Sequence, residues 1–586
     1  MHEFRVWAPE ARKLSVKIGD ALSPMSGPDE RGWWSARVDA AHVGTDYAFV
    51  LNDNAWASPD PRSAWQPSGV HGLSRLYDHS AFRWNDGDWN APPLASAVIY
   101  ELHVGTFTVE GTFDAAIEQL DYLAELGVTH LELMPVADFP GRFGWGYDGA
   151  ALFAVAQKYG GPDGLKRFVD ACHRRGLTVL LDVVYNHFGP VGSYATNFGP
   201  YLTKTHHTPW GDAVNFEDAG SDEVRRFFCD NALMWLRDYH LDGLRLDAVH
   251  AFVDRSAVHF MEQLSAEVEA LALASGRRLV VIAESDLNDP RFVTPRESGG
   301  YGMDAQWNDD FHHALFTVLN PNGNEKGYYA DFGSLAMLAK SLTKMYVYDG
   351  CYSRYRSHSH GRPAKDLSAH RFIGFIQNHD QVGNRAVGDR LASIVGIDRA
   401  KAAAGVVMTA PAIPLIFQGE EFAASTPFQY FADHDEPELA KAVFEGRKRE
   451  FAAFGWDPAA IPEPGSVETF ARSKLRWSET REAGHSEMFE WYRALIHLRR
   501  NSRALNQGGL ARIRVLFDEQ RHWLLMDRGP VKTMLNLGDT LAEFDVENGF
   551  RLALASRDDV TVRQKKVLLP PGTLAILSSE QADHAS

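Results

Sequence analysis

The chain has 586 residues, of which 45% are hydrophobic and 23% are charged. These fractions match those of soluble globular proteins and argue against a disordered or membrane-spanning chain. The 59 basic and 77 acidic residues give a net charge of −18, which argues against a nucleic-acid partner because nucleic-acid-binding surfaces are basic.

The cysteines and the N-terminal sequence predict the cellular compartment of the protein. Cys172, Cys229 and Cys351 are odd in number and far apart, so they fit neither a disulfide framework nor a CxxC metal site. Residues 1–20 lack a basic segment followed by an apolar run, and the sequence has no stretch of about 18 uninterrupted apolar residues. We therefore expect a cytoplasmic protein with no membrane segment.

Residues 1–90 predict a small domain built from strands. Four short runs alternate between apolar and polar residues and are separated by Gly, Pro, Asn and Asp: FRVWAP, KLSVKIG, WWSARVD and YAFVLN. Alternation of this kind is typical of strands with one buried face. We predict an N-terminal immunoglobulin-like β-sandwich.

From about residue 95 the apolar runs no longer alternate, which indicates strands covered on both faces, as in a parallel sheet. Helix-like segments lie between them, and two end at Gly176 and Gly276, as helices commonly do. Eight strands alternating with helices predict an α/β fold, a (β/α)8 TIM barrel that forms the catalytic domain over residues 91–504. A doubly wound open sheet is the alternative, although no GxGxxG motif opens a helix. The eight runs cover residues 97–107, 128–136, 177–187, 242–250, 277–286, 302–309, 371–380 and 413–422, and three helix-like segments cover 115–126, 165–175 and 257–275.

Two long insertions interrupt the predicted barrel, and a further domain follows it. Residues 188–222 are polar and rich in Gly, Pro and Thr, and residues 348–371 precede the seventh strand. Long loops in a compact domain are typically functional or disordered. Residues 505–586 return to short strands with turns, and we predict a C-terminal antiparallel β-sandwich domain there.

Polar residues lie at the C-terminal ends of the barrel strands, where a TIM barrel gathers its active-site loops. They are Asp182, Asn186 and His187 at the end of the third strand, Arg245, Asp247 and His250 at the end of the fourth, Glu284 at the end of the fifth, and Asn378, His379 and Asp380 at the end of the seventh. Asp247, Glu284 and Asp380 bring three carboxylates from three strands to one mouth. Carboxylates gathered in this way shift one another's pKa values, as acid-base chemistry requires.

The three carboxylates predict retaining glycoside hydrolysis. One carboxylate is then the nucleophile, a second is the protonated general acid about 5–5.5 Å away, and a third stabilises positive charge in the transition state. Arg245 lies two residues before Asp247, on the same side of an extended strand, where it would keep that carboxylate ionised. The alternative for Arg245 is a structural ion pair with Asp182.

A metal site is the competing use of these acids and histidines. The sequence has no HExxH motif or comparable close ligand spacing, and residues 188–222 lack a calcium-loop pattern such as DxDxDG. We predict neither a metal nor another cofactor.

Four motifs resemble, in their order and spacing, those of the alpha-amylase superfamily of retaining glycoside hydrolases: DVVYNH, GLRLDAVH, IAESD and FIQNHD. This resemblance implies that Asp247 is the nucleophile, Glu284 the acid/base and Asp380 the stabiliser of the transition state. It also implies that four residues hold the sugar just before the scissile bond, namely Tyr147, His187, Arg245 and His379.

Within the superfamily, five stretches are similar to the maltooligosyltrehalose trehalohydrolases: AESDLNDPR, WNDDFHHAL, NHDQVGNRAVGDRL, GEEFAASTPFQYFADH and EGRKREF. This similarity implies a maltooligosyltrehalose substrate, an α-glucan oligosaccharide from which trehalose is released in trehalose biosynthesis. It also implies a pathway partner, maltooligosyltrehalose synthase. Preferring trehalose over maltose as the leaving group requires matched polar groups for its hydroxyls, although Asn308 or Asp309 could instead cap a helix. We expect these polar groups to come from Asp309, Asp310, His312, Gln381 and Arg385.

Two other functions stay open on the sequence alone. A glycogen branching or debranching enzyme shares the motifs, and branching transfers the covalent intermediate to a sugar in place of water. A non-catalytic glucan-binding protein would share the barrel but predicts loss of at least one catalytic carboxylate, whereas Asp247, Glu284 and Asp380 are all present.

Overall fold

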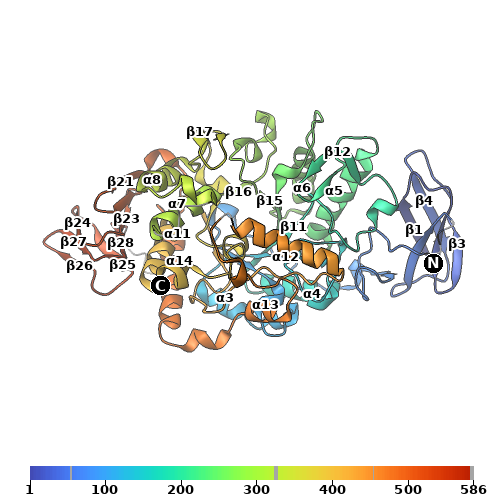
Figure 1. The fold of residues 1–586 in the computed structure, drawn as a ribbon, viewed down its shortest axis with the longest axis horizontal. Helices are drawn as coiled ribbons and strands as arrows, with labels where there is room; N and C mark the ends of the chain where they lie inside the picture. Colours follow the sequence, from blue (N-terminus) through green and yellow to red (C-terminus); the bar gives the residue numbers. More distant parts are fainter. Residues whose placement is uncertain (53, 55, 322–326, 453, 581–586) are drawn as a thin grey trace.

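The computed structural model describes residues 1–586 except 53, 55, 322–326, 453 and 581–586 (Figure 1). Within the described residues, eight parallel strands close into a barrel in chain order, and the last strand pairs with the first. Nearly every residue of these strands is buried. The predicted (β/α)8 barrel is confirmed, and the doubly wound alternative is wrong. The strands are β7 (Ile99–Leu102), β8 (His130–Leu133), β11 (Thr178–Val183), β14 (Gly243–Leu246), β15 (Val280–Ala283), β16 (Ala305–Trp307), β19 (Phe372–Gly374) and β20 (Ile413–Phe417).

Helices surround the barrel, as Figure 1 shows. The expected helix over 115–126 is divided into α2 (Phe113–Ile117) and α3 (Leu120–Leu126). The other two expected helices are present as α4 and α6, and Gly276 follows α6 in the left-handed conformation, with φ of 70°. The longer helices are α4 (Gly161–His173), α5 (Ser221–Asp238), α6 (Phe260–Ser275), α7 (Asp309–Leu319), α8 (Leu335–Lys344), α11 (Ile397–Thr409), α12 (Pro437–Ala452) and α14 (His485–Asn501).

The N-terminal residues form two sheets at one end of the molecule (Figure 1). In the first sheet, β1 (His2–Trp7) pairs antiparallel with β4 (Trp33–Val38). Arg62, which follows these strands, pairs with Asp230 of α5 at 2.7 Å and so attaches the N-terminal region to the barrel. The second sheet contains β2 (Leu14–Ile18), β3 (Ala21–Pro24), β5 (Asp46–Leu51) and β6 (Ser74–Arg75).

A C-terminal β-domain lies at the opposite end of the molecule (Figure 1). Arg528 of this domain is 7% exposed and donates to the backbone carbonyls of Thr409 and Ala410 at 2.9 and 3.0 Å, which connects it to the barrel. The prediction of β-rich domains on both sides of the barrel is confirmed, while the boundaries at residues 90 and 504 stay predictions. One sheet contains β21 (Arg514–Asp518), β22 (Trp523–Asp527), β23 (Val531–Asn536), β25 (Arg551–Ala555) and β28 (Thr573–Ser578), and the other contains β24 (Ala542–Asp545), β26 (Thr561–Arg563) and β27 (Lys566–Leu569).

Both predicted insertions contain a β-hairpin. In the first, β12 (Leu202–Thr208) pairs antiparallel with β13 (Gly211–Val214). In the second, β17 (Asp349–Ser353) pairs antiparallel with β18 (His358–Gly361). These strands are polar and partly exposed, so a search for apolar periodicity does not reveal them.

The cysteines lie apart as free thiols, with Cys172 and Cys229 buried and Cys351 exposed. In the described part of the chain, no helix has the length and apolar character that a membrane span requires.

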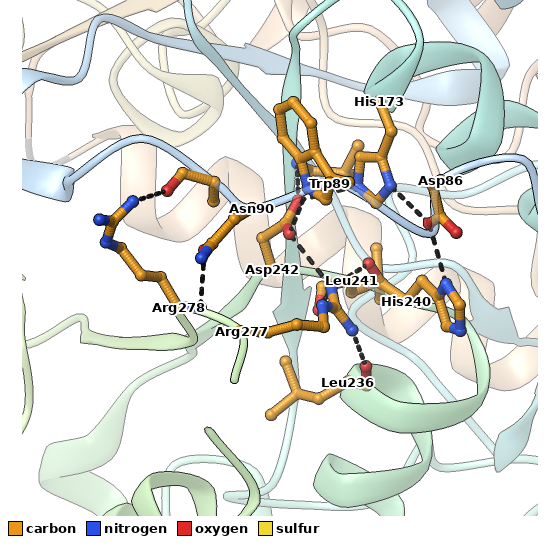
Figure 2. Close-up of polar contacts among 12 residues, drawn as sticks. Asp86, Trp89, Asn90, His173, Leu236, His240, Leu241, Asp242, Arg277 and Arg278 are labelled. Atoms are coloured by element: carbon orange, nitrogen blue, oxygen red, sulfur yellow. Dashed lines mark hydrogen bonds and ion pairs between the residues drawn. The ribbon is translucent and has the colours of Figure 1, made fainter. Parts of the chain in front are cut away.

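A buried network of acids and histidines closes the N-terminal end of the barrel (Figure 2). His173 lies between two carboxylates, with Nδ1 2.8 Å from Asp86 and Nε2 3.0 Å from Asp242. Asp86 also contacts Nδ1 of His240 at 2.8 Å, and Trp89 stacks on the His173 ring. Burial favours the neutral form of His173, but the two carboxylates raise its pKa above the ordinary value. The network therefore attaches the segment that precedes the barrel to the start of its fourth strand.

Asp86→Ala leaves both histidine rings without the acceptor that they share. We expect the substitution to cost about 3 kcal/mol of folding free energy, because removing one partner leaves a buried group uncompensated. The melting temperature measured by scanning fluorimetry at pH 7 should therefore fall. Asp88→Ala is the matched control, since Asp88 is exposed, and equal melting temperatures for the two variants would contradict a stabilising role for the network.

Candidate active site

The carboxyl ends of the barrel strands bring the predicted acids together. Asp182 of β11 and Arg245 of β14 are paired in register and are 2% and 0% exposed. Asp247 follows β14, Glu284 follows β15, and Asp380 lies in the first turn of α9 (His379–Gly383). The side chains of these three acids are 13%, 15% and 42% exposed, respectively, so a ligand at the mouth can reach them.

Arg245 is the centre of this cluster. Its Nη1 lies 2.7 Å from Oδ2 of Asp182 and 2.8 Å from Oδ1 of Asp247, and its Nη2 lies 3.7 Å from Oε2 of Glu284. The guanidinium carbon is 4.4 Å from the centre of the Trp307 ring. The sequence left two roles open for Arg245, an ion pair with Asp247 and a structural ion pair with Asp182. Both occur, because one nitrogen of Arg245 pairs with both acids.

Two further contacts orient the carboxylates of Asp247 and Glu284. The Asn186 side-chain amide donates to Oδ2 of Asp247 at 2.9 Å. Ala248 adopts a left-handed conformation with φ of 41°, and its backbone N–H donates to Oε2 of Glu284 at 2.7 Å. A non-glycine residue in this conformation is strained, and here the strained turn directs an amide at Glu284.

Glu284 is a buried acid held in its neutral form. Burial is the largest influence on the pKa of Glu284 and raises it. The positive charge of Arg245 lowers this pKa, and the negative charge of Asp247 raises it. The net result is a pKa of about 8. At neutral pH Glu284 therefore carries a proton and can donate it. Asp247, by contrast, forms a direct ion pair with Arg245.

Tyr147 and His379 form one wall of the site. The Tyr147 hydroxyl donates to Oδ2 of Asp182 at 2.5 Å and lies 2.7 Å from Nε2 of His379. The two rings stack with centroids 5.1 Å apart and 22° between their planes. Gly146, at φ of 100°, permits this placement of Tyr147, because a Cβ there would lie 2.3 Å from the Pro135 carbonyl oxygen.

Asp380 is held from its own helix and from α12. Its Oδ2 lies 3.5 Å from Nε2 of His379, and its Oδ1 accepts a hydrogen bond of 2.9 Å from the Asn384 side chain. Asn384 in turn accepts from Arg447 of α12 at 3.3 Å, and the Arg447 guanidinium packs over the Tyr430 ring at 4.2 Å. The position of Asp380, the most exposed of the three acids, thus depends on α12, a helix that comes much later in the chain.

His187 contacts the backbone of Tyr147. Its Nε2 is 3.1 Å from the Tyr147 carbonyl oxygen, and its Nδ1 bonds to the Asn186 side chain. Trp210, between β12 and β13, stacks on the His187 ring with centroids 5.2 Å apart and 6° between the planes. The first insertion therefore contacts the site through Trp210.

Of the residues expected to contact trehalose, Asp309 and Gln381 lie beside the three acids. The Gln381 amide is 3.4 Å from Oδ1 of Asp309. Burial, Asp286 and Asp380 together raise the pKa of Asp309 to about 7. Asn308 caps α7 by accepting from the Phe311 backbone N–H at 3.4 Å, so Asp309 is not needed for that task.

The side chains of Asp310, His312 and Arg385 are directed at protein groups. Asp310 is 4% exposed, and its Oδ2 accepts from two backbone amides just before β17, at 2.6 and 2.8 Å. His312 is 2% exposed and bonds to a backbone carbonyl after β19 and to the Tyr329 hydroxyl. Arg385 pairs with Asp389 at 2.8 Å. These three residues hold the loops around the site in place.

Three side chains near the acids are not among the site residues predicted from the sequence. Glu101 of β7 is an acid inside an apolar run, which is the same signal that pointed to Asp182, so it could have been found. Trp210 lies in a hairpin where no residue pattern sets it apart, whereas Arg447 lies in the EGRKREF stretch, in which no site residue is predicted from the sequence. Among the described residues, no group of three or more His, Cys, Asp or Glu side chains is arranged to hold a metal ion.

The fold and this arrangement of acids define a glycoside hydrolase of the alpha-amylase family. A family model described as the catalytic domain of alpha amylase matches residues 76–202. A crystal structure described as an alpha amylase from Salmonella typhimurium superposes with a TM-score of 0.90 at 36% identity, covering 98% of this chain and 97% of that one.

Sequence comparison identifies the particular family. Malto-oligosyltrehalose trehalohydrolase from Rhizobium sp. (strain M-11) is 48% identical over 581 residues, which cover 98% of this chain and 97% of the relative. The protein of the same name from Saccharolobus solfataricus is 44% identical, covering 90% of this chain and 89% of the relative. The chain belongs to the malto-oligosyltrehalose trehalohydrolase family, and the family predicted from the sequence is confirmed over the branching and non-catalytic alternatives.

Asn384→Ala removes the amide that holds Asp380. We expect kcat on an α-1,4-glucan oligosaccharide to fall about 10- to 100-fold with a smaller change in KM, because misplacing a reacting group by about 1 Å costs about 100-fold. Steady-state kinetics measure both constants. Asn501→Ala, which changes an exposed asparagine on α14, should behave as the unchanged protein, and full activity of Asn384→Ala would show that Asp380 needs no such support.

Proposed function

We propose that this enzyme hydrolyses the α-1,4 bond next to the terminal trehalose of maltooligosyltrehalose and releases trehalose and a shortened maltooligosaccharide. The observation that carries the chemistry is the pairing of a neutral Glu284 with Asp247 around one buried arginine. Near full-length similarity to the trehalohydrolases supports the substrate. The proposed reaction uses protein groups and water, without a metal or another cofactor.

In the first step, Asp247 attacks the anomeric carbon of the sugar before the scissile bond. A covalent glycosyl ester forms as the bond to trehalose breaks, and Glu284 gives its proton to the departing oxygen. Arg245 and Asn186 hold the Asp247 carboxylate for this attack. Asp380 stabilises the positive charge that develops on the sugar ring.

In the second step, water replaces trehalose. Glu284, now a carboxylate, takes a proton from the water, and the resulting attack breaks the ester to Asp247. Two inversions give overall retention of the anomeric configuration. Tyr147, His187 and His379 line the position of the reacting sugar in this proposal.

Recognition of trehalose falls to Asp309 and Gln381 in this proposal. Oε1 of Gln381 is buried and has no hydrogen-bond partner among the described residues, although the same side chain donates to Asp309. A sugar hydroxyl placed there would supply the missing donor, and a leaving group lacking it would be rejected. Asp310, His312 and Arg385 act by supporting this surface.

The proposed substrate must be made by an enzyme that converts the reducing end of a glucan to trehalose. We therefore propose maltooligosyltrehalose synthase as the pathway partner, and the three free cysteines support the cytoplasm as the site of action.

Product analysis tests the proposed substrate. Purified protein is incubated separately with maltotriosyltrehalose, maltopentaose and amylose, and the sugars are separated by anion-exchange chromatography. Trehalose and maltotriose should form from the first substrate, with little action on the second. Asp247→Asn is the control, and we expect its turnover to fall by several orders of magnitude because it lacks the nucleophile. New α-1,6 branches in amylose without trehalose would instead indicate a branching transferase.

The pH dependence tests the role of Glu284. The general acid must be protonated, and the pKa of Glu284 is about 8, so kcat/KM for maltotriosyltrehalose should fall as pH rises through about 8. With α-maltosyl fluoride, whose leaving group needs little protonation, the same alkaline decline should weaken. An equally steep decline with both substrates would remove Glu284 from the role of acid.

A further inference from the structure

A buried glutamate on the first barrel strand holds the histidine of the site from behind. Glu101 of β7 is 1% exposed. Its Oε1 lies 2.5 Å from Nδ1 of His379, and its Oε2 accepts a hydrogen bond of 3.0 Å from the His379 backbone N–H. Both carboxylate oxygens are therefore engaged by one residue, which fixes the start of α9 and the orientation of the imidazole.

The hydrogen bonds around His379 determine where its protons lie. The Tyr147 hydroxyl has one proton and donates it to Asp182 at 2.5 Å. Its oxygen must then accept from Nε2 of His379, 2.7 Å away. Since Nδ1 faces the Glu101 carboxylate, both ring nitrogens carry protons, and the ring is a cation.

The charged groups around His379 agree with this assignment. Glu101 approaches from β7, Asp380 from the same helix and Arg245 from β14, while Tyr147 contacts Nε2 from the loop before β10 (Ala151–Val155). Burial and Arg245 favour the neutral ring, whereas Asp380 and Glu101 favour the cation, and together they raise the pKa of His379 to about 9. His103, just after β7, is buried and has its pKa lowered to about 3 by that burial, so it adds no charge near neutral pH.

A second glutamate beside Glu101 provides an internal comparison. Glu132 of β8 is paired in register with Glu101 and is also 1% exposed. Neither of its carboxylate oxygens has a hydrogen-bond partner among the described residues. Burial and the neighbouring Glu101 raise its pKa well above the ordinary value. Glu132 is therefore neutral, and the charge that His379 senses from this wall of the barrel belongs to Glu101.

We propose that Glu101 is a positioning residue for the glycosidase reaction, whose carboxylate holds His379 as a doubly protonated ring directed at the reacting sugar and at Asp380. This inference rests on the proposed function, because it assigns His379 to the sugar-binding wall. A doubly protonated ring donates from Nε2 whatever its partner, so a sugar hydroxyl that displaces the Tyr147 oxygen always meets a donor. A neutral ring could place its one proton on Nδ1 and lose that donor.

The test compares Glu101→Gln with Glu132→Gln. The first substitution removes the anion and keeps the shape, so the pKa of His379 should fall by about one unit or more. With α-maltosyl fluoride, for which the alkaline decline caused by Glu284 is weak, the alkaline half-activity point of kcat/KM should then move to lower pH than in the unchanged protein. The second substitution replaces a neutral acid by a neutral amide of the same size, and the pH profile should not move. Identical profiles for all three proteins, or equal shifts in both variants, would overturn the proposal.

A direct measurement separates this inference from the proposed function. In protein labelled with 15N-histidine, the ring nitrogens of His379, assigned with a His379→Gln variant, should show the shifts of a doubly protonated ring at pH 7 and titrate near pH 9. A neutral ring at pH 7 would overturn the proposal even if Glu101→Gln fails to fold. Trehalose absent from the product analysis, with a doubly protonated His379, would refute the proposed function and leave the contact between Glu101 and His379 intact.

Discussion

Arg245 carries a full charge in the centre of the barrel with none of its side chain exposed, so the folded state depends on the anions placed around it. Removing an arginine from water is costly, and only close anionic partners repay that cost. Asp182 and Asp247 supply them at 2.7 and 2.8 Å from a single nitrogen. The same charge that makes burial of Arg245 possible also keeps the proposed nucleophile in place.

The environment of each acid decides what that acid can do. Asp247 meets Arg245 directly, whereas Glu284 lies at 3.7 Å from the other guanidinium nitrogen and is dominated by burial. Environments that differ in this way give neighbouring carboxyl groups separate roles in acid-base chemistry. Glu101 and Glu132 differ in the same way on the opposite wall of the barrel. A histidine pairs with Glu101, whereas neither carboxylate oxygen of Glu132 has a hydrogen-bond partner within the described part of the chain.

Elements outside the barrel strands complete the site. The first insertion places Trp210 on the His187 ring, and α12 places Arg447 beside Asn384, which holds Asp380. Asp310 fixes the backbone before the second insertion, so the neighbouring Asp309 is held at the mouth. The positions of His187, Asp380 and Asp309 therefore depend on contacts between the barrel and segments that fold over it.

The sequence by itself determined the barrel and its acids, because buried parallel strands appear as unbroken apolar runs and a charged residue inside such a run is conspicuous. All eight strands were found in this way, and so were Arg245, Asp247, Glu284 and Asp380. The sequence could not show which polar residues of WNDDFHH face the site. Neighbouring residues on a helix point in different directions, and the helix can be packed in more than one orientation. In the structure Asp309 faces the mouth, while Asp310 and His312 bond inside the protein. Only the tertiary structure decided which of these faces the site, because that choice depends on packing between segments distant in the chain.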